Sequence, residues 1–144
     1  MEYPEKCIKG MPNRNCYYIF EGSPVGSVEL FCFSKNRCRG DGWIEESINW
    51  MDDELAIDLT LNQRKLNGEL QFRAGIAILP HAELKSVKKR FFSILDYERR
   101  PKDDNPYHGN ILLNSKINNT LKTHIRVLLG DKAEIKPREG NQAG

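Results

Sequence analysis

An Asn-Gly pair, Asn67-Gly68, lies between two segments in which every second residue is apolar, and this feature most constrains the fold. The segments are residues 54–63 and 69–79, and a period of two is typical of a half-buried β-strand. Asn-Gly is the preferred central pair of a two-residue type I′ hairpin turn. The sequence therefore predicts that the two segments form an antiparallel hairpin.

A two-residue turn also predicts how the two strands align. If Leu66 lies opposite Glu69, then Ile57 lies opposite Ile78 and the other apolar residues of the two segments also face one another. A slip by one residue would move every apolar side chain to the other face. The predicted hairpin therefore has one apolar face and one polar face.

Residues 42–51 are predicted to add a third strand to this sheet, with a chain reversal at Asp52-Asp53. This strand also presents apolar residues to the core face, although Glu46 falls on that face too. Asp-Asp is not a preferred pair for a tight turn. A short helix over part of 43–54 is therefore the alternative.

The remaining segments predict an α+β domain. Residues 16–20, 27–34 and 110–114 read as strands, the second with Cys32 in the core, whereas 80–95 and 118–130 have apolar residues at helical spacing. The last of these also fits a strand. A mostly antiparallel meander followed by about two helices packed on one face of the sheet is the predicted fold class.

The length of 144 residues fits a single domain. Residues 1–12 and 136–144 are polar or rich in Gly and Pro, so we expect them to fray. The chain has neither a secretory h-region nor an apolar run long enough to span a membrane, which predicts a cytoplasmic protein with no membrane partner.

The four cysteines are too irregularly spaced for a zinc site. They are separated by eight, fifteen and five residues, whereas structural zinc ligands come in close pairs. We predict reduced thiols, no metal and no cofactor. The cysteines are Cys7, Cys16, Cys32 and Cys38.

Positive charge is concentrated in the second half of the chain. Residues 1–72 contain 8 Lys or Arg and 12 Asp or Glu, and residues 73–144 contain 14 and 8. A basic helix can bind nucleic acid, but acidic residues are interspersed, so a solvated helix face is the simpler interpretation. The nucleic-acid alternative uses Lys85, Lys88, Lys89 and Arg90.

The hexapeptide Asn105–Asn110 (NPYHGN) contains the most suggestive candidate for chemistry. His108 can act as an acid or a base near neutral pH, and Arg99 and Arg100 can hold a phosphate group. This arrangement defines one hypothesis, a small ribonuclease-like enzyme that acts on phosphodiesters. An ordinary turn uses the same residue types, and that is the alternative.

The polar face of the predicted sheet is the main candidate binding site. Because a tryptophan bordered by amides and arginines is typical of an interface, our first hypothesis is a non-catalytic module that binds a protein partner, such as an accessory, inhibitor or immunity-type subunit. A plain solvated sheet face is the alternative. The candidate binding residues are Trp43, Asn49, Asn62, Arg64, Gln71 and Arg73, together with Tyr107 and Asn110.

Overall fold

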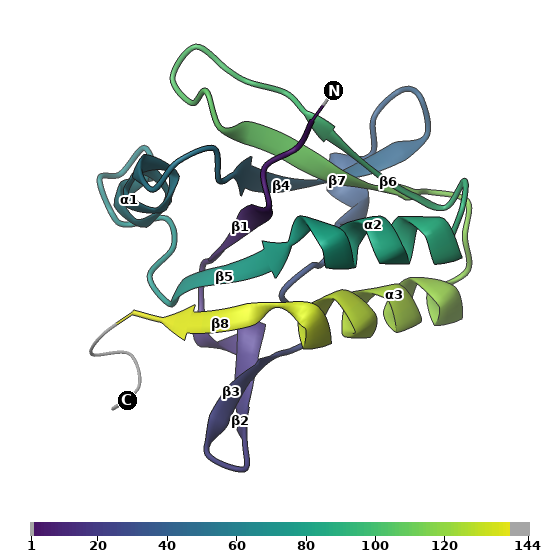
Figure 1. The fold of residues 1–144 in the computed structure, drawn as a ribbon, viewed down its shortest axis with the longest axis horizontal. Coiled ribbons are helices and arrows are strands. Elements are labelled where there is room, and N and C mark those ends of the chain that lie inside the picture. The colour runs from purple at the N-terminus through teal and green to yellow at the C-terminus, as the bar shows by residue number, and fades with distance from the viewer. Residues whose placement is uncertain (1, 139–144) are drawn as a thin grey trace.

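The computed structural model describes residues 2–138, which form a six-stranded sheet, a separate two-stranded hairpin and three α-helices (Figure 1). The strands are β1 (Lys6–Met11), β2 (Tyr17–Phe20), β3 (Ser23–Gly26), β4 (Trp43–Trp50), β5 (Gly75–Pro80), β6 (Leu95–Arg99), β7 (His108–Asn114) and β8 (Glu134–Pro137). The α-helices are α1 (Leu55–Asn62), α2 (His81–Arg90) and α3 (Asn119–Lys132), and two 3₁₀ turns span Arg14–Cys16 and Lys35–Arg37.

The large sheet has the strand order β6-β7-β4-β1-β5-β8, and every neighbouring pair is antiparallel. Helices α2 and α3 lie side by side, away from α1 (Figure 1). The predicted α+β class with a mostly antiparallel sheet is therefore confirmed.

The two faces of the sheet are covered differently. One face packs against α2 and α3, where Trp50 of β4 shares a buried cluster with Leu84 and Ile125. On the other face, α1 covers β1 and β5, and Ala56 of α1 packs with Ile8 in a smaller cluster. On this second face α1 also reaches β4 through the hydrogen bond between Thr60 and Asn49. Farther along β4 and β7 most side chains on this face are polar, as at Ser47 and Asn110.

The prediction that residues 54–63 form a strand is wrong, because most of this segment is α1. Its buried residues, Ala56 and Thr60, are four positions apart, as a helix face requires. The side chain of Asp53 accepts a hydrogen bond from the backbone of Leu55 at 2.9 Å, so the Asp-Asp pair begins a helix instead of reversing a hairpin.

The chain turns at residues 65–68, but the predicted hairpin with Asn67-Gly68 as its central pair is not confirmed. The Lys65 N–H donates to the Glu69 carbonyl at 2.8 Å and the Gly68 N–H to the Lys65 carbonyl at 3.0 Å. Only one isolated bridge, between Arg64 and Leu70, extends this turn, and β5 begins at Gly75. The predicted strand alignment is therefore absent.

Residues 42–51 do form a strand, β4, but its neighbours are β1 and β7. Glu46 lies on the core face of β4, as predicted, and its charge is compensated there by two partners. Its carboxylate accepts a hydrogen bond from the Phe33 backbone at 2.7 Å and lies 2.5 Å from Lys9 Nζ. A buried charge that is paired and hydrogen-bonded in this way is tolerated.

Both predicted helices are present, as α2 and α3. Asn118 caps α3, accepting a hydrogen bond from the Leu121 backbone at 2.8 Å. The prediction that Gly130 ends α3 is wrong, because the helix continues for two more residues. Gly130 instead packs against Gly26 of β3. Residues 2–138 contain no helix long and apolar enough to cross a membrane.

Two segments predicted to be strands occur as predicted, whereas a third does not. Residues 16–20 contain β2 and residues 110–114 lie in β7. Residues 27–34 form no strand, and Phe31 and Phe33 are buried in the core from an irregular segment.

The prediction of frayed ends is wrong where the structure describes them. Residues 1–12 contain β1, which lies between β4 and β5 inside the sheet. At the other end, Lys136 and Pro137 belong to β8, and residues 139–144 lie outside the described part of the chain. The polar composition of 1–12 is compatible with a strand because β1 still contributes Cys7, Ile8 and Met11 to the core.

Candidate functional site

A cleft of about 260 Å³ opens on the sheet face that α2 and α3 leave free. Five parts of the chain line it: strand β1, the 3₁₀ turn at Lys35–Arg37, strand β4, the end of α1 with the following segment, and the connection from β6 to β7 with the first residue of β7. The polar lining residues are Arg37, Ser47, Asn49, Thr60, Gln63, Gln71, Lys102, Asp104, Asn105 and His108.

Three buried polar side chains make the cleft rigid. The Asn49 amide donates to the Thr60 hydroxyl at 2.7 Å, and that hydroxyl donates to the Ala56 carbonyl, also at 2.7 Å. The Asn105 amide in turn donates to the Asn49 side-chain oxygen at 2.8 Å. The chain of bonds connects α1, β4 and the β6–β7 connection, and buried groups paired in this way specify one arrangement.

The hexapeptide Asn105–Asn110 is a tight turn that leads into β7. Backbone bonds of 2.9 and 3.0 Å join Lys102 and Asn105 in both directions. The Asn105 side chain accepts from the Tyr107 backbone at 3.0 Å, and the Tyr107 hydroxyl donates to Asp53 at 2.8 Å. Asn105 and Tyr107 therefore hold the turn in place, and the next residue enters the sheet.

That next residue, His108, lies directly opposite Asn49 in the β4–β7 pairing and shares its face. It is only 8% exposed, and no residue among 2–138 forms a hydrogen bond with its imidazole ring. Burial is the main cause that lowers the pKa of His108, and the positive charge of Lys102 lowers it further. The ring is therefore neutral at pH 7 and offers the cleft one donor and one acceptor.

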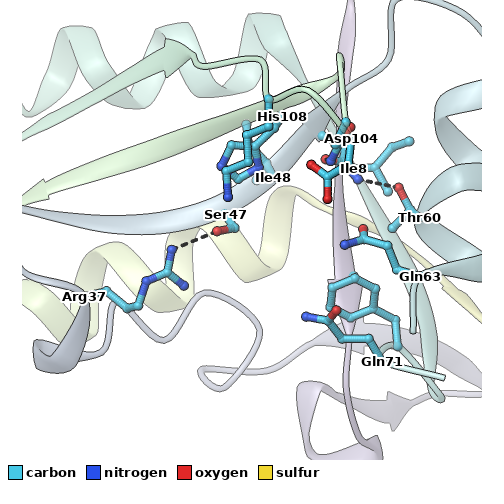
Figure 2. A pocket seen from close by; sticks show the side chains of 14 residues that line it. Ile8, Arg37, Ser47, Ile48, Thr60, Gln63, Gln71, Asp104 and His108 are labelled. Atoms are coloured by element: carbon cyan, nitrogen blue, oxygen red, sulfur yellow. Dashed lines mark hydrogen bonds between the residues drawn. The ribbon is translucent and has the colours of Figure 1, made fainter. Parts of the chain in front are cut away.

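Two different walls face each other across the cleft. Figure 2 shows Arg37, Ser47 and His108 on one side and Thr60, Gln63 and Gln71 on the other. On the first side, an Arg37 guanidinium nitrogen donates to the Ser47 hydroxyl at 3.0 Å. The first wall therefore offers a guanidinium, a hydroxyl and an imidazole, and the second offers two amides and the Thr60 hydroxyl.

Among residues 2–138, the side chains of Gln63 and Gln71 have no hydrogen-bond partner. Phe72 lines the same cleft, and its ring packs on Gly10 of β1 so closely that a Cβ at that position would be 2.3 Å from the Phe72 Cγ. A glycine on this face of β1 therefore makes room for an aromatic ring to lie on the sheet and line the cleft.

The structure brings together only part of the predicted chemical cluster. His108 lines the cleft, but Arg99 does not, and its guanidinium lies 2.6 Å from Asp52. Arg100 is exposed, 3.6 Å from Glu98, and does not line the cleft either. The cations that line the cleft are Arg37 and Lys102. Arg100 is joined to His108 through the backbone, its N–H donating to the His108 carbonyl at 2.8 Å, and a joint role of His108 with Arg99 and Arg100 stays a prediction.

The predicted binding face is also divided. Asn49 and Gln71 line the cleft, but Asn62 ends α1 and donates to the Asp58 carbonyl at 2.9 Å. Arg64 donates to the Gly68 carbonyl at 2.8 Å within its own turn. Because α1 is a helix, these side chains do not share one sheet face.

The other predicted binding residues lie outside the cleft. Trp43 is half-buried at the first position of β4, opposite Asn114. Arg73 is exposed and borders a separate depression that Pro12 and Arg14 also line. Neither extends the surface that Asn49 and Gln71 share.

Asn110 is buried beside the cleft in a charged network. Its side-chain nitrogen donates to Glu98 at 2.8 Å and to Glu45 at 3.1 Å, and Arg39 lies 2.9 Å from Glu98. Within residues 2–138, the side-chain oxygen of Asn110 has no partner. Asn110 thus stabilises the sheet next to the cleft and does not line the cleft itself.

Sequence reasoning missed Arg37 and Gln63. Each comes from a connecting segment, where neither strand nor helix periodicity indicates which way a side chain points. The polar alternation of β4 was one signal that pointed to the cleft, because it places Ser47 and Asn49 on a common polar face.

A second surface of a different kind is the β2–β3 hairpin, which projects from the lower side of the molecule in Figure 1. Its two-residue turn is Glu21-Gly22, with φ values of 50° and 82°, as in a type I′ turn. Three consecutive apolar side chains follow β2 toward the tip: Tyr18, Ile19 and Phe20 are 49%, 62% and 59% exposed. A groove of about 520 Å³ runs beside them.

The cysteines contribute to neither surface. Cys7 and Cys16 are buried, Cys38 is exposed, and all four thiols are free. Cys32 is half-buried, not in the core as predicted, and donates to the Glu29 carbonyl at 2.9 Å. Burial raises the pKa of the Cys7 thiol to about 12. In the part of the chain that the structure describes, no three His, Cys, Asp or Glu side chains are grouped to hold a metal ion.

The polar cleft and the apolar hairpin are thus the two candidate functional surfaces. No protein family model, no curated protein and no solved structure matches this chain.

Proposed function

We propose that this protein is a non-catalytic, cytosolic interaction module and that its β2–β3 hairpin binds a protein partner. The exposure of Tyr18 and Phe20 on one face of an ordered hairpin, and of Ile19 on the other, carries the proposal. Single exposed apolar residues are common, but adjacent large ones mark a surface that is covered in the working assembly. The interaction surface is therefore the hairpin and not the polar sheet face.

The base of the hairpin is fixed to the domain, which makes it suitable for presenting these side chains. Tyr17 is 9% exposed and belongs to the main core. Gly26 contacts α3 so closely that a Cβ there would be 2.4 Å from the Gly130 carbonyl oxygen. A rigid hairpin loses little conformational freedom on binding, and this favours affinity.

The partner that fits best is an extended strand with apolar side chains. Phe20 and Ser23 flank the turn and form a hydrogen-bonded pair. By the alternation of an antiparallel ladder, the N–H and C=O of Ile19 then point outward from β2. On the other edge, Pro24 removes a donor. The β2 edge is therefore the one that accepts another strand, as in β-augmentation.

The experiment compares capture of partners by three immobilised proteins: wild type, Ile19→Asp and Leu66→Asp. Leu66 is fully exposed outside the hairpin, so its variant adds the same charge elsewhere. The proposal requires a protein retained by wild type and Leu66→Asp but lost with Ile19→Asp. A purified pair should then show a Kd raised at least about tenfold by Ile19→Asp.

Ile19→Pro tests the strand geometry separately. It removes the outward N–H without removing a bond of the β2–β3 ladder, so the hairpin should persist and binding should fall. Circular dichroism and thermal unfolding check that each variant is folded. If the purified partner binds Ile19→Asp and wild type equally, the hairpin is not the interaction surface.

A second candidate function is phosphodiester chemistry in the cleft. The observation that favours it is a neutral, buried His108 near the cations Arg37 and Lys102, since a neutral imidazole can accept a proton and cations can stabilise phosphate charge. Incubation of purified protein with single-stranded RNA tests it. Cleavage that His108→Ala abolishes supports an enzyme, whereas intact RNA after prolonged incubation excludes this candidate.

A further inference from the structure

The cleft has two chemically distinct ends within one small volume. Figure 2 places Arg37 and His108 across from Gln63 and Gln71. A volume of about 260 Å³ is near the lower end of the range for small-molecule sites. A ligand that satisfies both ends is therefore small and carries an anionic group at one end and hydrogen-bonding edges at the other.

The cationic end suits a phosphate ester. Arg37 uses one guanidinium nitrogen to bind Ser47, which orients the group and leaves its remaining donors for a ligand. Lys102 adds a second positive charge, and His108 adds a donor. Asp104 also lines the cleft, but the two cations outnumber this one carboxylate, so the net formal charge of these groups remains positive.

The amide end suits a planar base. Each glutamine offers a donor and an acceptor, which is the pattern presented by the edge of a nucleobase. Phe72 lies flat on Gly10 and lines the same cleft, and an aromatic ring of this kind stacks bases without strict sequence preference. A sugar or an acidic side chain alone would use only one end of the cleft.

We infer that the cleft is a binding site for a single nucleotide unit, with the phosphate at Arg37 and Lys102 and the base at Gln63, Gln71 and Phe72. The unit is either a free mononucleotide or one nucleotide of a single strand, since both present the same groups. The inference does not rest on the hairpin, which belongs to a different part of the molecule.

The first experiment titrates wild-type protein with the four ribonucleoside 5′-monophosphates, with inorganic phosphate and with the unphosphorylated nucleosides. Binding is measured by isothermal calorimetry and by shifts of the His108 and glutamine side-chain resonances. At least one mononucleotide should bind about tenfold or more tightly than either phosphate or its nucleoside alone. Equal affinity of phosphate and mononucleotide, or no binding of any mononucleotide, would overturn the inference.

Two variants assign the ends of the ligand. Arg37→Ala should weaken the mononucleotide about tenfold while leaving nucleoside binding unchanged, and Gln71→Ala should weaken both, because the base is common to them. Lys89→Ala removes an exposed charge from α2 and is the charge-matched control. If Lys89→Ala weakens binding and Arg37→Ala does not, nucleotides bind to the basic helix and the cleft assignment is wrong.

A single-stranded oligoribonucleotide distinguishes the two sources of the ligand. If it binds more tightly than a mononucleotide and remains sensitive to Arg37→Ala, the natural ligand is a strand. If mononucleotide and oligonucleotide bind alike, it is the free nucleotide. Ile19→Asp should leave both affinities unchanged, so failure of the hairpin proposal and failure of the cleft assignment can be told apart.

Discussion

The ring of Phe72 occupies the space above Gly10, so that a Cβ added to this glycine would lie 2.3 to 2.5 Å from three carbons of the ring. We expect Gly10→Ala to displace the ring and to lower the free energy of unfolding by about 1–3 kcal/mol, the usual cost of overpacking. Urea denaturation measures this loss. In a double-mutant cycle with Phe72→Ala, the two changes should couple strongly, because the smaller residue removes the clash.

Gly40→Ala is the control for this prediction, since nothing lies within 4 Å of a Cβ at Gly40. Its effect should stay within about 0.5 kcal/mol of wild type. Equal stability of Gly10→Ala and wild type would mean that the ring moves aside without cost and is not a fixed wall of the cleft.

Thr60 is predicted to be essential for the rigidity of the cleft. In Thr60→Val the shape is kept, but the Asn49 amide loses the acceptor that now lies 2.7 Å away. An unsatisfied buried donor costs about 1–3 kcal/mol, so chemical denaturation should show a loss of that size. Thr123→Val, the same change at an exposed position of α3, should have little effect. A small effect at both positions would contradict a structural role for the buried chain of bonds.

The hairpin tip can be stabilised without touching its apolar side chains. Glu21 has a φ of 50°, a left-handed conformation that asparagine adopts more readily than glutamate. Glu21→Asn should therefore raise the free energy of unfolding by up to about 1 kcal/mol, and Glu21→Val should lower it. Thermal unfolding measures both. If Val is tolerated as well as Asn, the backbone at this turn differs from the one described.

The parts of the fold that could be predicted are those in which periodicity and local signals agree. In α2 and α3, helical spacing coincided with an N-terminal proline or an asparagine cap, and both helices were found. The strand β4 was found because its polar and apolar residues alternate. In α1 the two signals conflicted, since Leu55, Ile57, Leu59 and Leu61 alternate as in a strand. The acidic run Asp52-Asp53-Glu54, typical of a helix start, was the better guide.

The cleft could be predicted only in part, because its residues come together through tertiary contacts. Asn49, Gln71 and His108 were identified from their own segments. Their partners Arg37 and Lys102 lie on connections whose positions depend on the strand order β7-β4-β1. That strand order could not be predicted from the sequence, because the residues of β1 were interpreted as a frayed terminus. The hairpin tip was missed because adjacent aromatic residues in a strand usually pack inside.

Two histidines predict how stability depends on pH. Burial is the main cause that lowers the pKa of both His108 and His81, and a nearby lysine lowers each further, Lys102 in the first case and Lys85 in the second. In the unfolded chain both rings bind protons as the pH falls through about 6.5. The folded protein binds them only at lower pH, so the unfolded state is favoured in that interval.

Stability should therefore be constant between about pH 7 and pH 8 and decrease from about pH 6.5 toward pH 5.5, before most carboxylates begin to titrate. Urea denaturation at several pH values measures the slope. His108→Gln and His81→Gln should each reduce the slope, and the double variant should remove most of it, because a glutamine cannot take up a proton. A stability that rises as the pH falls through this interval would show that the two rings gain protons on folding, which is incompatible with a lowered pKa for both rings.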